Sequence, residues 1–304
     1  MTAPATVALA HRAVLAITGE DRHAFLQGLL TNDISKVTSE AAQWSALLTP
    51  QGKYLHDFFI VGGLLGEDPA LLFDCEAARL DDLKTRLSRY KLRSKAALTP
   101  LPDLSVHAVF GPGALDALGL PETAGAARTL EDGSVAFVDP RLPAMGARIL
   151  GKAPASLPSA MPEDYDRLRY GLGLPDGSRD IEIEKGLMLE SGFEELGGVD
   201  FSKGCYVGQE LTARTRYRGL IKKRLLTLEM ASGSAPEPGS ILKTAAGKEA
   251  GEMRSAVSLG EAGALGMGLI RLEALEEGTA TLSAPDGSPV TVKMADWVTL
   301  QNAQ

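Results

Sequence analysis

Residues 199–219 read Val-Asp-Phe-Ser-Lys-Gly-Cys-Tyr-Val-Gly-Gln-Glu-Leu-Thr-Ala-Arg-Thr-Arg-Tyr-Arg-Gly. A single thiol, Cys205, lies among glycines, with Lys203 before it and three arginines after it. The run that begins at Gln209 can form a helix, whereas the glycines favour an irregular backbone just ahead of it. We therefore expect Cys205 near a helix N-terminus, where amide dipoles and neighbouring cations favour the thiolate over the thiol.

Three kinds of chemistry suit such a thiol: a redox reaction, acceptance of a one-carbon unit, or brief ligation of iron or a cluster. One cysteine cannot hold an iron–sulfur cluster, which normally takes four thiolates or substitutes, so a cluster role needs partners. The glycines and cations around Cys205 are not typical of a core position. Cys75 follows Leu71-Leu72-Phe73 and is expected to be buried in the core.

We predict that Lys203 and Arg214 set the positive charge around Cys205. Gly204 and Gly208 are expected to permit backbone geometry that a side chain would forbid. These expectations make the loop itself, as much as the thiol, a candidate site.

Composition and charge exclude several classes of protein. With 304 residues, 44% hydrophobic and 23% charged, the chain fits a folded soluble protein of two or three domains. Its net charge of -8 argues against direct nucleic acid binding. Scattered histidines predict no stable metal site, and no apolar run reaches the roughly 18 residues of a membrane helix. Two distant cysteines and the absence of a signal peptide at the N-terminus predict a cytoplasmic location.

The first 150 residues alternate irregularly between apolar runs and amphipathic segments, which predicts an α+β region. Thr18 and Asp21 form a start signal for the first helix, and Pro50 and Gly52 predict a turn between two strands. A Pro-rich connector at residues 151–162 could mark a boundary. The predicted strands are residues 13–17, 45–49, 54–61, 70–75, 106–110, 135–138 and 147–150, and the predicted helices are residues 21–30, 77–92, 114–118 and 163–172.

The last third of the chain is rich in short β-runs separated by turn signals, which predicts a small β-barrel. Its expected strands are residues 224–230, 240–244, 266–272, 279–283 and 290–294. Residues 176–220 before it are expected to form a long structured loop region. We therefore predict an α+β region over residues 1–220, with one lobe of residues 1–100 and 151–220 and another of residues 101–150, followed by a barrel over residues 221–304.

Several motifs together resemble one family, the YgfZ-type folate-binding proteins of iron–sulfur cluster assembly. They are Tyr165-x3-Arg169-x-Gly171-x-Gly173-x-Pro175, Glu190-x-Gly192, Asp200-Phe201-x-Lys203-Gly204-Cys205-Tyr206-x-Gly208-Gln209-Glu210 and Arg218-Gly219. The N-terminal Gly19-x-Asp21-x3-Phe25-Leu26-Gln27-Gly28-x2-Thr31-x-Asp33 and Pro50-x-Gly52 also fit, so the resemblance spans nearly the whole chain. The run from Lys203 to Glu210 is its most specific part.

This family resembles the glycine-cleavage T-protein, an aminomethyltransferase that uses tetrahydrofolate. The resemblance implies a T-protein-like three-lobed α+β fold with a C-terminal small β-barrel and a central folate channel. It implies a tetrahydrofolate-binding accessory protein for assembly, delivery or repair of iron–sulfur clusters in client enzymes, tRNA-modifying ones included, rather than a classical enzyme. Its partners would be folate and iron–sulfur client or carrier proteins, and any cluster would be held transiently.

Folate suggests roles for individual residues. A pterin presents two donors side by side, which a carboxylate can accept together, and Glu190 is our candidate; its alternative is a solvated loop glutamate. Arg224, with Lys222 and Lys223, suits the carboxylates at the other end of folate, unless these cations are only a charged strand margin. The other positions that we assign to folate binding are Gly204, Tyr206, Gly208, Gln209 and Glu210, of which the last two could also cap or orient the loop.

A second hypothesis is a folate-dependent one-carbon transferase or demethylase. The transferases have a Gly-x3-Asp-Asp pattern, where this chain has Tyr54-Leu55-His56-Asp57-Phe58-Phe59. His56 replaces one acid, whereas Asp57 remains and would act as a charge near the reacting nitrogen. Since neighbours in a strand face opposite sides, the two side chains should point apart. The transferases lack a cysteine at position 205, which favours the first hypothesis, and the acidic composition opposes a third, direct RNA contact by a tRNA-modification factor.

Overall fold

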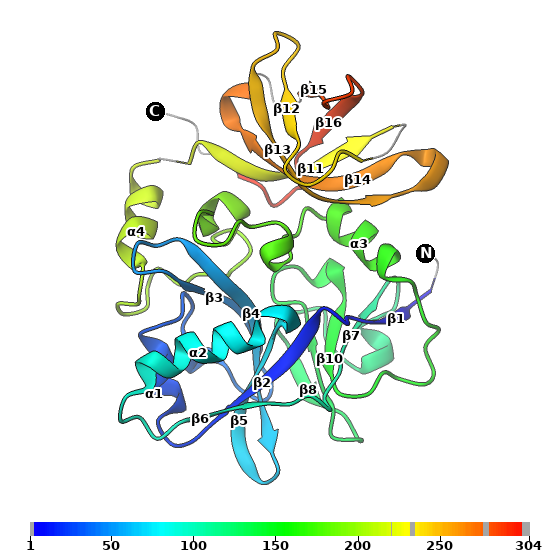
Figure 1. The fold of residues 1–304 in the computed structure, drawn as a ribbon. Coiled ribbons are helices and arrows are strands. Elements are labelled where there is room, and N and C mark those ends of the chain that lie inside the picture. The colour runs from blue at the N-terminus through cyan, green and yellow to red at the C-terminus, as the bar shows by residue number, and fades with distance from the viewer. Residues whose placement is uncertain (1–2, 220, 232–234, 276–279, 300–304) are drawn as a thin grey trace. The chain divides into compact units, whose positions relative to one another are not determined.

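The computed structural model describes residues 3–219, 221–231, 235–275 and 280–299 (Figure 1). The chain forms two compact units that interleave along the sequence. The first comprises Met1–Tyr165 and Leu196–Gln209, and the second comprises Asp166–Glu195 and Glu210–Gln304. The domain boundary predicted at residue 220, and the division of residues 1–220 into two lobes, stay predictions.

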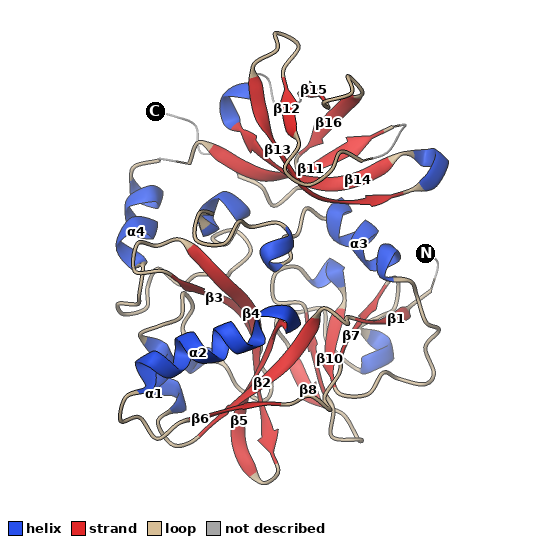
Figure 2. Cartoon of the chain, in the orientation of Figure 1, coloured by secondary structure: helices blue, strands red, loops and turns tan. Residues whose placement is uncertain are grey.

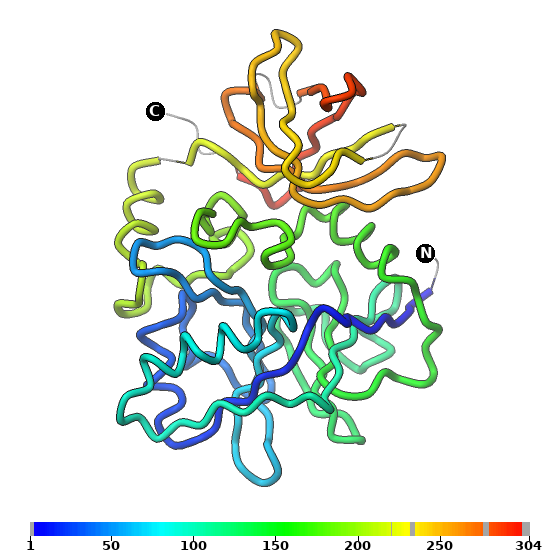
Figure 3. Tube along the Cα trace, in the orientation of Figure 1, coloured from blue at the N-terminus to red at the C-terminus, as the bar shows by residue number. Residues whose placement is uncertain are grey.

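The first unit is built on two five-stranded sheets whose neighbouring strands are antiparallel. One has the order β1 (Ala5–Ala8), β7 (Val106–Phe110), β10 (Ala147–Leu150), β9 (Val135–Val138) and β8 (Ala127–Thr129). The other has the order β3 (Gln43–Leu48), β4 (Tyr54–Leu65), β5 (Asp68–Glu76), β2 (Arg12–Thr18) and β6 (Ala97–Pro100). In Figure 3 the blue N-terminal strand lies beside a green strand about a hundred residues later, which explains why sequence patterns alone give no strand order.

Two helices pack on the second sheet, and both appear beside its strands in Figure 2: α1 (Arg22–Gln27) and α2 (Leu80–Lys91). Leu83 and Leu87 of α2 join Leu15 and Phe73 of the sheet in one apolar core. The helical turn η2 (Ala77–Arg79) precedes α2, so the predicted helix over residues 77–92 is confirmed. The predicted short helix at 114–118 is a 3-10 turn, η3 (Asp116–Leu118).

The first helix is shorter than predicted. Thr18 stays in β2, and the carboxylate of Asp21 accepts a hydrogen bond from the backbone N–H of Lys95 (2.7 Å) instead of capping its own helix. The helix ends at Gln27 because Leu30 already forms a β-bridge with Leu47. The start signal therefore predicts the helix correctly, but the Asp21 side chain does not cap it.

The second unit contains α3 (Pro162–Gly171) from Asp166 onward, the turns η5 (Gly177–Arg179) and η6 (Met188–Ser191), α4 (Gln209–Tyr217) from Glu210 onward, and a closed barrel. The barrel order is β11 (Lys223–Met230), β14 (Ala264–Arg271), β13 (Glu249–Ser258), β12 (Ile241–Lys243), β15 (Thr281–Ser283) and β16 (Pro289–Lys293). The predicted barrel and the predicted helix over residues 163–172 are confirmed, although residue 279, the expected start of one strand, lies outside the described residues. No helix in the described part of the chain is long and apolar enough to cross a membrane.

Sequence patterns missed β13, which carries Glu, Gly, Arg and Ser and therefore has low β-propensity. Its inward positions nevertheless alternate, with Met253, Ser255 and Val257 buried. Gly251 is required because a Cβ there would lie 2.5 Å from the carbonyl oxygen of Leu269 on the neighbouring strand.

Candidate functional site

The loop that carries Cys205 is fixed to the first unit ahead of the thiol. The backbone N–H of Asp200 donates to the Thr31 carbonyl (3.1 Å), and its carboxylate accepts from Lys36 Nζ (2.6 Å) and from the backbone N–H and Oγ of Ser202 (2.7 and 2.5 Å). The Lys36 ammonium and Ser202 hold the pKa of Asp200 well below its usual range. Asp200 is therefore an anionic anchor of the loop.

Lys203 is the second anchor. Its buried ammonium donates to the carbonyl oxygens of Gln27 (2.8 Å), Leu30 (2.6 Å) and Asn32 (2.8 Å). Three acceptors match the three N–H donors of an ammonium. Burial lowers the pKa of Lys203 to about 8, so it is still protonated at neutral pH. The ammonium is enclosed by carbonyls and ties the loop to the end of α1, while the prediction that Lys203 sets the charge beside Cys205 stays a prediction.

The loop is fixed again directly after the thiol. Tyr206 is buried, and Val207 donates its backbone N–H to the Gly28 carbonyl (3.0 Å). Gly208 has a φ of +85°, and a Cβ there would lie 2.6 Å from the Thr49 carbonyl oxygen. The prediction that Gly208 permits a forbidden geometry is therefore confirmed.

Between these anchors, Gly204 and Cys205 are exposed. Gly204 has no positive φ, and a Cβ there would meet open space, so the prediction of a backbone need for glycine at this position is wrong. Cys75, as predicted, is buried; burial raises the pKa of its thiol to about 12. Cys205 is thus an exposed thiol on a loop whose neighbours on both sides are held in place.

Asp57 and His56 lie on β4, and both are buried. The carboxylate oxygens of Asp57 accept from Trp44 Nε1 (2.9 Å) and from the Tyr54 hydroxyl (2.7 Å). His56 Nε2 lies 2.8 Å from the carboxylate of Asp82. The two side chains thus have different partners, in keeping with opposite faces of the strand, and a catalytic role for Asp57 stays a prediction.

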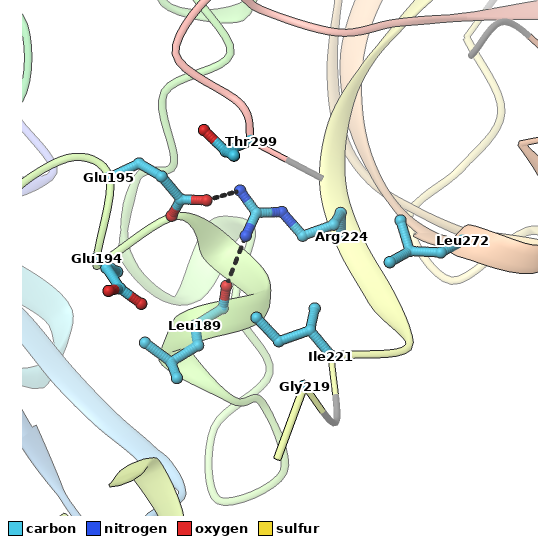
Figure 4. Close-up of a pocket in the computed structure, with 8 residues that line it drawn as sticks. All are labelled: Leu189, Glu194, Glu195, Gly219, Ile221, Arg224, Leu272 and Thr299. Carbon is cyan, nitrogen blue, oxygen red and sulfur yellow. Dashed lines mark hydrogen bonds and ion pairs between the residues drawn. The ribbon is translucent and has the colours of Figure 1, made fainter. Parts of the chain in front are cut away.

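A pocket of about 220 Å³ lies within the second unit (Figure 4). Buried Arg224, on β11, donates from Nη2 to Glu195 Oε1 (2.6 Å) and from Nη1 to the Leu189 carbonyl (3.1 Å). Arg224 Nε and Glu195 Oε2 are buried and have no hydrogen-bond partner among the described residues. The remaining lining residues are Glu194, Gly219, Ile221, Leu272 and Thr299. The expectation that Arg224 offers a free charge to folate carboxylates needs correction, because Glu195 already neutralises it.

The other predicted folate residues are not brought together in this pocket. Glu190 is half-buried on η6 and does not line it. Gln209 begins α4 in the first unit, while exposed Glu210, in the second, pairs with Arg214 (2.8 Å). Arg214 therefore has its own partner, and its predicted influence on Cys205 stays a prediction.

Sequence reasoning missed the residues that receive the loop. Thr31 Oγ1 donates to the Gly198 carbonyl (2.8 Å), and Asn32 Nδ2 donates to the Gly197 carbonyl (2.8 Å). Thr31 is part of the N-terminal motif, but the motif alone does not indicate that Thr31 contacts the loop. Glu195 was also missed, although the run Glu194-Glu195-Leu196-Gly197-Gly198 was visible in the sequence.

No group of three or more His, Cys, Asp or Glu side chains within the described residues could hold a metal ion.

Residues 222–300 match the family model described as the CAF17 C-terminal β-barrel domain. A crystal structure of the glycine cleavage system aminomethyltransferase T from Bartonella henselae superposes with a TM-score of 0.75, covering 99% of this chain and 88% of that chain at 15% identity. At this identity the likeness shows the fold, and the predicted T-protein-like fold with a C-terminal barrel is confirmed.

Two relatives are named "Iron-sulfur cluster assembly factor IBA57, mitochondrial". The one from Homo sapiens is 34% identical over 307 residues, and the one from Mus musculus is 35% identical over 315 residues. Each alignment covers 94% of this chain and 83% of the relative. The expectation of a cytoplasmic location is contradicted, since these relatives are named as mitochondrial. The finer YgfZ-type assignment stays a prediction, while the chain belongs to the IBA57 family of iron–sulfur cluster assembly factors.

Proposed function

We propose that Cys205 supplies one thiolate ligand to an iron–sulfur cluster that this protein holds together with a partner during cluster assembly. The observation that carries the proposal is an exposed thiol flanked by fixed residues, with Lys203 before it and Val207 and Gly208 after it. A ligand held in place loses less conformational freedom when it binds. Because the thiol is also exposed, a second protein can reach it.

A partner has to complete the ligand set. A cluster normally takes four thiolates or substitutes, and Cys75 is buried away from solvent. Within the described residues no other His, Cys, Asp or Glu group forms a ligand set. Carrier proteins would share the cluster with Cys205, and client enzymes, tRNA-modifying ones among them, would receive it.

The test compares the two cysteines. Purified protein is added to a cluster-loaded carrier and to the apo form of an enzyme whose activity depends on its cluster. We expect Cys205→Ala to lower the activation rate to that seen without the protein, while Cys75→Ala, the matched loss of the other thiol, keeps the rate once its folding is verified. Full support by Cys205→Ala would refute the proposal.

We also propose that the pocket beside Arg224 takes the pterin ring of tetrahydrofolate, which when bound supplies a nitrogen able to accept a one-carbon unit. Glu195 Oε2 offers an acceptor and Arg224 Nε a donor, both buried and without a hydrogen-bond partner among the described residues. A volume of about 220 Å³ is below the roughly 300–1,000 Å³ of pockets for drug-sized ligands. It suits a bicyclic ring, so the rest of folate would extend beyond the pocket.

Calorimetric titration with tetrahydrofolate tests this part separately. We expect Glu195→Gln to weaken binding about tenfold, because the neutral amide oxygen is a weaker acceptor than the charged carboxylate oxygen Oε2. Glu190→Gln decides between the two acceptors: an equal loss there, with none at Glu195, would support the acceptor predicted from the sequence. Absence of binding up to millimolar ligand would contradict a folate role and leave the role of Cys205 untouched.

A further inference from the structure

The second half of α2 and the loop after it form a basic segment on an acidic protein. Residues 84–95 contain six Lys or Arg and no Asp or Glu, whereas the chain has a net charge of -8. Arg89 and Arg93 are exposed, and neither forms an ion pair with another described residue. Two cations thus face solvent without compensation.

Two of the other cations in this segment have acidic partners. Arg86 Nε contacts the Asp82 carboxylate (2.8 Å), and Lys95 pairs with Glu20. Asp81, at the start of α2, is the exposed acid on the same helix. The positive character therefore concentrates at the C-terminal end of α2.

Apolar side chains are exposed within this charge cluster. Tyr90 is 41% exposed and Leu92 is 89% exposed. Leu92 ends α2 with a φ of +46°, a backbone conformation that costs energy for a residue with a side chain. An apolar residue held out at a strained helix end is an unusual feature for a surface with no partner.

A hollow of about 240 Å³ adjoins this helix end, and we call it the α2 groove. Its floor consists of buried aliphatic side chains, and its rim consists of exposed residues of several types. The floor is Leu47, Leu48 and Leu55, and the rim includes Pro50, Arg89 and Tyr90.

The loop that carries the thiol packs against two of the residues that line the α2 groove. A Cβ at Gly208 would lie 2.9 Å from Leu48 Cβ and 2.6 Å from the Thr49 carbonyl oxygen, so the loop packs directly on the groove's lining residues. Cys205 is three residues earlier, and three extended residues span at most about 11 Å. A molecule in the groove would therefore lie close to the thiol.

We infer that the α2 groove docks an acidic segment of a partner protein, with carboxylates on Arg89 and Arg93 and an apolar side chain against Tyr90 and the groove floor. This inference rests on the proposed function, because a partner that shares a cluster with Cys205 must bind beside it. Arg89 lies unpaired among the described residues on the rim of the apolar floor, and Arg93 follows four residues later outside the groove, so together they fit carboxylates next to a Leu or aromatic side chain.

The shape and charge favour a protein segment over a membrane or nucleic acid. A concave floor of Leu47, Leu48 and Leu55 accommodates one apolar side chain, whereas a membrane presents a broad surface and a phosphate backbone has no apolar group to place there. An extended polyanion such as a nucleic acid would also meet the net charge of -8 on the rest of the protein, whereas a short acidic segment contacts only the basic end of α2.

The probe is a synthetic peptide rich in Glu and Asp with one Leu and one Trp, carrying fluorescein for anisotropy. Its control is the same peptide with Gln and Asn replacing the acids. The variant Arg89→Glu with Arg93→Glu is matched by Lys243→Glu with Lys248→Glu, which makes the same charge change at exposed barrel positions. All four substitutions are on the surface, and circular dichroism verifies their folding.

We expect salt-sensitive binding of the acidic peptide that falls about tenfold in the α2 variant and stays unchanged in the barrel variant. The neutral peptide should bind weakly to every variant. A bromoacetyl group on the peptide should alkylate Cys205 faster in the native protein than in the α2 variant. Equal peptide affinity in both variants, or no binding up to about 1 mM, would overturn the inference.

Sedimentation with vesicles containing phosphatidylserine, and anisotropy with a single-stranded oligonucleotide, test the other occupants. Binding to either that is lost in the α2 variant, with no peptide binding, would assign the groove to that ligand and overturn the inference. Cys205→Ala should keep peptide affinity, so failure of the cluster role and failure of the groove give different results.

Discussion

The Cys205 loop and the Arg224 pocket each contain a buried cation that the sequence predicts to be functional, yet the two cations have different kinds of partner. Lys203 meets three neutral carbonyls and holds an exposed thiol in position. Arg224 forms an ion pair with the carboxylate of Glu195, so the two charges neutralise each other inside the second unit. Position in the sequence therefore does not tell whether a cation such as Lys203 or Arg224 is free to pair with a ligand. The first region exposes a thiol at Cys205, and the pocket offers single hydrogen-bonding atoms.

The largest expected effect comes from breaking the ion pair in the pocket. Arg224→Met leaves the Glu195 carboxylate without its partner, and we expect a loss of about 4 kcal/mol in the free energy of unfolding of the second unit. Urea unfolding followed by Trp297 fluorescence, in a Trp44→Phe background, measures it. The double variant with Glu195→Leu should recover most of the loss; a loss that is simply additive would contradict the coupling of these two residues.

Acid should act on the first unit through His56. Burial, with the nearby Arg79 guanidinium, lowers the pKa of His56 to about 4, below its ordinary value of 6.5. The unfolded chain therefore binds the proton first, so stability is fully present above pH 6.5 and is lost as the pH falls, by about 3 kcal/mol at pH 4. Unfolding followed by Trp44 in a Trp297→Phe background measures this loss. His56→Gln should abolish this part of the pH dependence, and an unchanged profile would refute the assignment.

A smaller effect is expected at the loop anchor. Lys203→Met leaves three carbonyls without their ammonium donor, although some can regain water, so we expect a loss of about 2 kcal/mol. Hydrogen exchange at the Val207 amide should accelerate because the loop is released from Gly28. Lys36→Met, which removes an exposed anchor at Asp200, is the control and should cost less. Equal losses would show that burial of the Lys203 ammonium is not what fixes the loop.

Local signals predicted much of the fold, and close packing explains what they missed. The barrel followed from short β-runs and turn residues, whereas β13 was hidden because Gly251 and polar residues suit the close approach of Leu269 rather than strand propensity. The exposure of Cys205 and the burial of Cys75 followed from their neighbours. The partner of Arg224 did not, because contact between Glu195 and the first barrel strand depends on tertiary packing. Lys203 likewise gave no sign that it faced carbonyls of residues 27–32.

The most direct measurement is the rate at which iodoacetamide alkylates Cys205, followed by mass spectrometry with the cluster-loaded carrier and with the apo carrier. A thiolate bound to iron is not available to an alkylating reagent, so we predict strong protection by the loaded carrier and little by the apo form. The Arg89→Glu, Arg93→Glu variant should lose part of this protection at low carrier concentration. Equal alkylation of the native protein with loaded and apo carrier would contradict the claim that Cys205 is a cluster ligand.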